Sequence, residues 1–88
     1  MSSLERRAIA LGAEGLRPSW RVGKKWAVLY RGSWLHFGSS LYDDFTVHKD
    51  PVRRAAYRRR HAGILLRDGR AAYTVKTSPA FWSYYLLW

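Results

Sequence analysis

Hydrophobic and polar residues alternate over residues 25–37, and this pattern predicts a β-hairpin. Its strands are expected at residues 26–30 and 33–37, joined by the two-residue turn Arg31-Gly32, in which glycine supplies a positive φ. Because side chains alternate between the two faces of a strand, each strand should turn one face toward the core. The groups that share a face are Trp26, Val28 and Tyr30; Trp34 and His36; and Leu35 and Phe37.

A helix is predicted over residues 51–62, which carry signals at both ends. Asp50 suits the N-cap, Pro51 suits the first helical position, and Gly63 is expected to end the helix in the left-handed conformation. At about 100° per residue, the small apolar side chains fall on one narrow arc, which should face the core. This arc consists of Val52, Ala55, Ala56 and Ala62.

The last stretch of the chain predicts a second helix, with Ser78 as the cap and Pro79 at the first helical position. Nearly all of its other side chains are apolar or aromatic. A domain this small needs its large aromatic residues inside, so we expect this helix to be core. A face that docks a partner, or an anchor at a membrane interface, is an alternative for the same residues.

The remaining segments have weaker patterns. Residues 1–22 are expected to form a flexible arm that includes a short helix. A second hairpin is expected from residues 64–66 and 72–76, turning at Asp68-Gly69. Residues 23–88 should then form one small α+β domain, with an N-terminal β-hairpin, a central basic helix and an aromatic C-terminal helix.

Charge changes this picture most. Sixteen Lys and Arg residues oppose six Asp and Glu residues, which gives a net charge of +10. Such an excess repels itself in the free protein, so it indicates a polyanionic partner. Most of the cations are arginine, which binds phosphate bidentately and stacks on flat rings, and nucleic acid is therefore the expected partner. Charge that serves solubility alone is the alternative.

The chain has no cysteine, which excludes disulfides and the usual structural zinc sites. A reducing compartment or a virion interior is therefore the expected setting. The N-terminal apolar run is too short for a signal peptide, and no segment approaches the roughly 20 apolar residues that span a bilayer. We expect a protein that is not secreted and has no membrane span.

The central helix carries five arginines and no acidic residue, although like charges at this spacing destabilise an isolated helix. Its polar side holds two stripes, one of Arg53, Tyr57 and Arg60, and one of Arg54, Arg58 and His61. Together with Lys49 these are the candidate nucleic-acid-binding residues, the arginines contacting phosphate and Tyr57 stacking on a base. The alternative is a solvated basic face with Tyr57 packed at its edge.

Histidines and acids do not form a recognisable catalytic or metal-binding pattern. His36, His48, Asp50 and His61 match no compact ligand motif. Asp43-Asp44, in the loop of residues 38–50, are expected to pair with the helix arginines rather than to hold magnesium. No phosphate-binding loop and no nucleophile motif is present. We therefore expect no metal site, no cofactor, no small-molecule substrate and no enzymatic activity.

The blocks HFGSSLYDDFTVHKDPVRRAAYRRRH and AFWSYYLLW resemble a family of small basic proteins encoded by large DNA viruses of eukaryotes and by some phages. The shared pattern is HFG, then D-[YF]-T-x-H-K-D, then R-x-x-Y-x-x-R-H and a closing F-W-S-x-x-L-L-W. It lies within residues 36–61 and 80–88, with Ala80 where the family usually has glycine, and the N-terminal arm is unmatched. The resemblance implies a viral origin and a shared fold, and it assigns no reaction.

The leading interpretation is an accessory or genome-packaging protein that binds DNA or RNA through the arginine-rich helix. One alternative is a minor capsid or virion protein that uses its aromatic residues and arginines to bind other virion proteins. A second alternative is a small metal-dependent enzyme. The expected location is the virion, or the cytoplasm or nucleus of an infected host cell.

Overall fold

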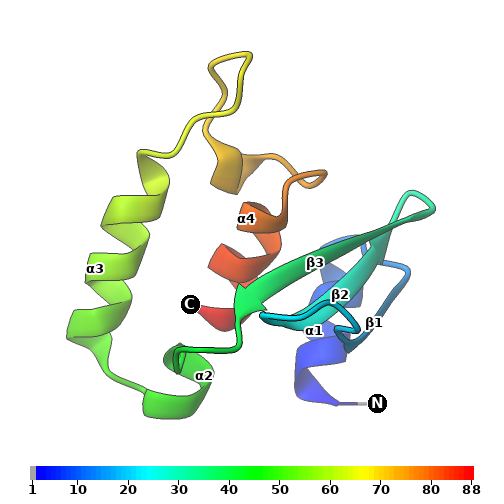
Figure 1. Ribbon diagram of the computed structural model, residues 1–88, viewed down its shortest axis with the longest axis horizontal. Coiled ribbons are helices and arrows are strands. Elements are labelled where there is room, and N and C mark those ends of the chain that lie inside the picture. Colours follow the sequence, from blue (N-terminus) through cyan, green and yellow to red (C-terminus); the bar gives the residue numbers. More distant parts are fainter. Residues whose placement is uncertain (1) are drawn as a thin grey trace.

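A computed structural model describes residues 2–88, and a three-stranded antiparallel sheet lies along one side of the domain (Figure 1). The strands, in spatial order, are β1 (Gly15–Pro18), β2 (Lys24–Tyr30) and β3 (Ser33–Ser39). The predicted hairpin is confirmed as β2 and β3, which place Trp26 opposite Phe37. Its turn residues Arg31 and Gly32 both have positive φ, at 48° and 77°, as a two-residue hairpin turn of this kind requires.

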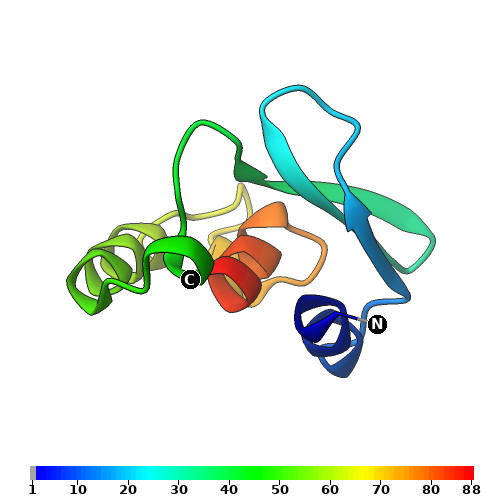
Figure 2. The same cartoon turned by 90° about the horizontal axis from the view of Figure 1, so that it is seen from below.

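The helices lie on one side of the sheet, where Figure 2 shows α1, α4 and α3 side by side. The helical segments are α1 (Ser3–Ala10), α2 (Phe45–His48), α3 (Pro51–Ala62), the 3-10 turn η1 (Ala72–Thr74), α4 (Pro79–Trp82) and the π-helical turn η2 (Ser83–Leu87). Since α4 runs directly into η2, we call the two together the C-terminal helix. This arrangement confirms the predicted α+β fold class. None of the helices in residues 2–88 has the length and apolar character needed to cross a bilayer.

The hydrophobic core lies between the inner face of the sheet and the C-terminal helix. Val28 and Phe37 of the sheet meet Trp82, Leu86 and Leu87 of the helix, and each of these side chains is at most 2% exposed. The expectation that the aromatic C-terminal stretch is core is therefore confirmed.

Capping residues begin both predicted helices where the sequence indicated. Asp50 accepts a hydrogen bond from the Val52 N–H (2.9 Å), and Ser78 accepts one from the Ala80 N–H (3.3 Å). Gly63 follows the end of α3 as expected, but its φ is −87°, so the predicted left-handed conformation is wrong. Its N–H donates back to carbonyls of the last helical turn, which closes α3 without a left-handed residue.

The segment expected to be a flexible arm, residues 1–22, carries structure that packs within the domain. The predicted short helix is confirmed as α1, and β1 pairs with β2. Ala8 and Ala13 are buried in the core, at 0% and 6% exposure. Small side chains at these positions let α1 approach the sheet closely, a packing role that the polar and glycine-rich sequence around them concealed.

The second predicted hairpin is wrong in its strands. The turn at Asp68-Gly69 is present, because Gly69 has a φ of 87° and its N–H donates to the Leu66 carbonyl. Pairing is limited to a single bridge between Leu65 and Ala71, after which the chain enters η1. Leu65 is 63% exposed, and an isolated ribbon without a buried face does not extend into a stable pair of strands.

Helix α3 is turned the opposite way from the prediction. Val52 is 76% exposed and Ala55 and Ala62 are exposed, so the arc expected to face the core faces water. Tyr57 is buried instead, and α3 lies beside the C-terminal helix rather than on the sheet (Figure 1). A buried aromatic ring removes roughly 150–250 Å² from water, and the small side chains of the arc cannot compete with that area.

Candidate functional site

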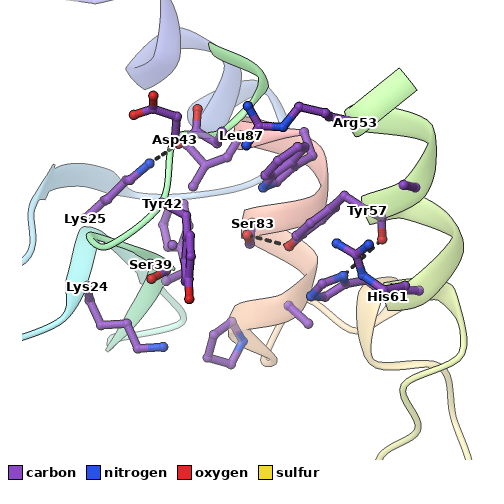
Figure 3. A pocket seen from close by; sticks show the side chains of 18 residues that line it. Lys24, Lys25, Ser39, Tyr42, Asp43, Arg53, Tyr57, His61, Ser83 and Leu87 are labelled. Carbon is purple, nitrogen blue, oxygen red and sulfur yellow. Dashed lines mark hydrogen bonds and ion pairs between the residues drawn. The ribbon is translucent and has the colours of Figure 1, made fainter. Parts of the chain in front are cut away.

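A groove with a volume of about 610 Å³ lies between the sheet and α3 (Figure 3). The C-terminal helix forms its floor, with Pro79, Ser83 and Leu87. Helix α3 forms one wall, and the start of β2 with the loop after β3 forms the other. We refer to this feature as the groove. It brings together segments that are far apart in the chain, from Lys24 to Trp88.

Two arginines extend along the α3 wall. Arg53 and Arg60 line the groove with Ala56 between them, because residues three and four positions apart share one face of a helix. Both arginines are exposed, and among residues 2–88 neither has a carboxylate within 4.0 Å. The predicted stripe of Arg53, Tyr57 and Arg60 therefore does line a common surface.

Tyr57 lies between two other rings on this wall. Its ring stacks on Trp88, with centroids 4.2 Å apart and 6° between the planes, and on His61, with 3.7 Å and 17°. The Tyr57 hydroxyl shares a hydrogen bond of 2.8 Å with Ser83 Oγ, and burial raises the pKa of Tyr57, so the hydroxyl stays protonated. We call Trp88, Tyr57 and His61 the ring stack.

His61 ends the ring stack on the side of the groove. Its Nδ1 lies 3.0 Å from the Tyr57 carbonyl oxygen. A carbonyl only accepts, so Nδ1 carries a proton. His61 is half-buried and lines the groove, so its ring belongs to the groove surface.

Arg54 and Arg58 have a different role from their neighbours. Both are half-buried, and both donate through Nε to the main-chain carbonyl of Trp88. The Arg54 guanidinium also lies 4.7 Å from the centre of the Phe45 ring, and that of Arg58 lies 4.8 Å from the Tyr84 ring. Their expected place on the solvent side of α3 is therefore wrong, since they attach this helix to the C-terminal residues.

An ion pair stabilises the wall opposite α3. Lys25 Nζ lies 2.7 Å from Asp44 Oδ2, and Asp44 is buried. The same carboxylate accepts a hydrogen bond from the Thr46 N–H (3.0 Å) and so caps α2. The expected pairing of Asp43-Asp44 with the helix arginines is wrong, because Asp44 is held by Lys25 and Asp43 is exposed at the groove.

Lys24 and Tyr42 complete this wall. Both side chains are exposed, Tyr42 to 70%, and Figure 3 shows Tyr42 across the groove from Tyr57 and His61. Neither position was among the predicted site residues. Tyr42 stands in a loop of glycine, serine and aspartate, with no strand or helix that would carry it into the core. This sequence context indicates an exposed tyrosine.

Gly38 lets the sheet approach the floor of the groove. Its φ is 80°, a conformation that other residues rarely adopt. A Cβ atom at this position would lie 2.7 Å from Leu87 Cδ1, which is too close unless that side chain moves. The close approach of β3 to the C-terminal helix therefore depends on glycine.

Lys49, the remaining predicted contact residue, does not line the groove. It follows α2 with a φ of 56°, and its Nζ lies 5.7 Å from the centre of the Phe45 ring. The predicted site residues thus divide into those in the groove and those beside it. Arg53, Tyr57, Arg60 and His61 line it, and Arg54, Arg58 and Lys49 do not.

The histidines lie in separate environments. His48 Nδ1 accepts a hydrogen bond from the Asp50 N–H (2.9 Å), while the Asp50 side chain caps α3. His36 lies on the outer face of the sheet, where its Nδ1 is 2.8 Å from Ser19 Oγ and Trp20 packs edge-on. Within residues 2–88 no group of three His, Cys, Asp or Glu side chains is placed to hold a metal ion.

The segments that carry the resemblance meet at the groove. The HFG segment supplies Phe37 and Gly38, and the Y-x-x-R-H segment supplies Tyr57, Arg60 and His61. The closing aromatic segment supplies Ser83, Leu87 and Trp88. Part of the pattern that is spread over the sequence therefore comes together at the groove, while other members, such as His36 and Lys49, lie outside it.

Comparison with known proteins assigns the chain to a sequence family. No curated protein and no solved structure matches the chain. A sequence family described as "Family of unknown function (DUF5754)" matches residues 14–61, a range that runs from β1 through most of α3 and includes both walls of the groove. Because this match covers more than half of the 88 residues, the chain belongs to that family.

Proposed function

We propose that this protein binds nucleic acid in the groove, with phosphates on the cations at its edges. The observation that carries the proposal is the pair Arg53 and Arg60 on the aromatic α3 wall, with Lys24 on the opposite side of the groove. Arginine and lysine without acidic partners are the usual ligands of a phosphate backbone. An accessory or genome-packaging role, which the basic helix favours, is part of this proposal, and the viral setting comes from the resemblance.

The charge of the whole domain supports it. Of the sixteen Lys and Arg side chains, only Lys25 and Arg70 lie within 4.0 Å of a carboxylate among the described residues 2–88. Arg7, Arg54 and Arg58 bind main-chain carbonyls. The remaining cations are available to a polyanion, and their repulsion in the free protein would be relieved when it binds.

The capsid-docking alternative has less support. It would be favoured by an aromatic C-terminal surface exposed to solvent. Phe81, Trp82, Leu86 and Leu87 are instead buried in the domain, each at most 7% exposed. Those side chains are already used by the core and are not available to a partner.

Binding should depend on salt and on the groove arginines. If about three phosphates are neutralised, log K should fall against log salt with a slope of about −2 on single strands and about −3 on duplex DNA. The double variant Arg53→Ala/Arg60→Ala should bind several-fold more weakly and with a slope shallower by about 1 to 2. Fluorescence anisotropy with labelled oligonucleotides over a salt series measures both quantities.

The matched control removes the same charge elsewhere. Arg59 and Arg67 are exposed and do not line the groove. The variant Arg59→Ala/Arg67→Ala should therefore lose less affinity than the groove variant. Equal losses from the two variants, or no binding of wild type at low salt, would refute a groove-centred site.

A further inference from the structure

We infer that the groove accepts one unpaired nucleobase, so that the protein prefers single-stranded nucleic acid to duplex. This inference rests on the proposed function and specifies the class of ligand. It is drawn from the ring stack on one wall, an unpartnered ring on the other, and the arrangement of charge around them.

The α3 wall is aromatic, and its rings are held in place. The three rings of the ring stack are nearly parallel, with 6° and 17° between adjacent planes, so both faces of Tyr57 are covered and it meets the groove with its edge. The hydrogen bond between Tyr57 and Ser83 and that between His61 and the Tyr57 carbonyl fix these rings. Ring edges contact the face of another aromatic ring favourably, so a flat ligand in the groove can meet this wall in an edge-to-face arrangement.

Tyr42 faces this wall from the other side of the groove (Figure 3). It is 70% exposed, and among residues 2–88 no other aromatic ring packs against it. Its neighbour Leu41 is 82% exposed but does not line the groove. A planar group between Tyr42 and the α3 wall would cover an aromatic side chain that the fold leaves in water.

The charges are arranged for a nucleotide rather than for phosphate alone. Lys24, Arg53 and Arg60 lie at the edges of the groove, whereas its interior is lined by apolar side chains such as Ala80 and Leu87. A groove that only tracks a phosphate backbone is positively charged along its length. Asp43 also lines the groove, and its carboxylate would repel a phosphate but can accept a hydrogen bond from an exocyclic amine.

The size of the groove agrees with one nucleotide. Its volume of about 610 Å³ lies within the range of roughly 300–1,000 Å³ that is typical of small-ligand sites. A base in a duplex is stacked on both faces and paired at its edge, and extruding it costs a few kcal/mol. An unpaired base enters without this cost, so the preference is for a single strand.

The test compares three ligands of equal length at fixed salt, by fluorescence anisotropy. These are a labelled single-stranded DNA, its duplex, and a single strand with abasic sites throughout. Stacking of one base contributes enough that the intact single strand should bind about tenfold or more tightly than the abasic one. It should also bind more tightly than the duplex.

The variants isolate the ring on the loop. Tyr42→Ala should lower affinity for the single strand about tenfold and leave duplex affinity nearly unchanged, whereas Tyr42→Phe should bind like wild type. Leu41→Ala, in the same loop, is the matched control and should also bind like wild type. Thermal melting checks that each variant folds, which we expect because both side chains are exposed.

The outcomes separate the inference from the proposed function. Equal affinity for intact and abasic strands, or a Tyr42→Ala variant that binds the single strand like wild type, would overturn the base site. The proposed function would still hold if Arg53→Ala/Arg60→Ala weakened binding in the same assay. Failure of wild type to bind any of the three ligands at low salt would overturn both.

Discussion

Adjacent residues of α3 have contrasting surroundings, and Arg53 and Arg54 illustrate this at the smallest scale. Arg53 is exposed at the groove, while Arg54 is half-buried against Phe45 and donates to the Trp88 carbonyl. The sequence places two identical side chains side by side. Only the 100° rotation between helix positions, about a quarter of a turn, separates a ligand contact from a structural one.

Substitution of these two residues should therefore have different effects on stability. Arg54→Ala should lower the free energy of unfolding by about 1–3 kcal/mol, since it removes a charged hydrogen bond to the Trp88 carbonyl and the contact of the guanidinium with the Phe45 ring. Arg53→Ala should stay within about 0.5 kcal/mol of wild type because it loses no packing contact. Urea denaturation followed by tryptophan fluorescence measures both, and similar losses from the two variants would contradict the orientation of α3.

At the scale of elements, α3 is attached through rings and arginine stems rather than through aliphatic side chains. The aliphatic arc that amphipathic analysis selects has little to bury, because it consists of one valine and three alanines. Tyr57 offers far more area, and it finds Trp88, which lies about thirty positions further along the chain. The pattern of small residues is thus outweighed by a partner that local sequence does not reveal.

Stability measurements on α3 test this attachment. Tyr57→Ala should cost about 3–5 kcal/mol, as for other buried aromatic residues, and it also leaves Ser83 without its hydrogen-bond partner. Val52→Ala should change stability by less than about 0.5 kcal/mol, because Val52 is 76% exposed. The reverse order of effects in thermal melts would show that the aliphatic arc faces the core.

The sequence signals that located structural elements correctly are each confined to a few neighbouring residues. Asp50-Pro51 and Ser78-Pro79 locate two helix starts, and Arg31-Gly32 locates the hairpin, because capping and turn geometry are decided within one turn of chain. The groove depends on encounters between distant segments. Lys25 with Asp44 and Tyr57 with Ser83 have no signature in local sequence, so half of the site could not be located in advance.

At the scale of the whole molecule, the sheet has two unlike faces. The inner face forms the core with the C-terminal helix, while the outer face carries Arg17, Trp20, Trp34 and His36. His36 is only 7% exposed there, and burial, together with the nearby Arg21, lowers its pKa from the ordinary value of 6.5. The folded domain therefore favours the neutral imidazole.

This lowered pKa makes stability depend on pH. Below about pH 6.5 the unfolded chain binds a proton at His36 more readily than the folded domain does, so acid favours unfolding. The contribution is complete above pH 6.5 and is lost as pH falls toward the lower folded pKa. Thermal melts from about pH 7 to about pH 5 should show a smaller drop in Tm for His36→Gln than for wild type. Parallel curves for the two proteins would contradict this assignment.

Side chains set the spacing between the two walls of the groove, and this bears on which bases can enter it. In residues 2–88 no main-chain hydrogen bond joins α3 to the sheet, so the spacing of the two walls is set by rings and side chains packed across the C-terminal helix. Purine and pyrimidine rings are equally thick, so at the proposed site either could enter between these walls, and the protein would recognise a free base without distinguishing which base it is.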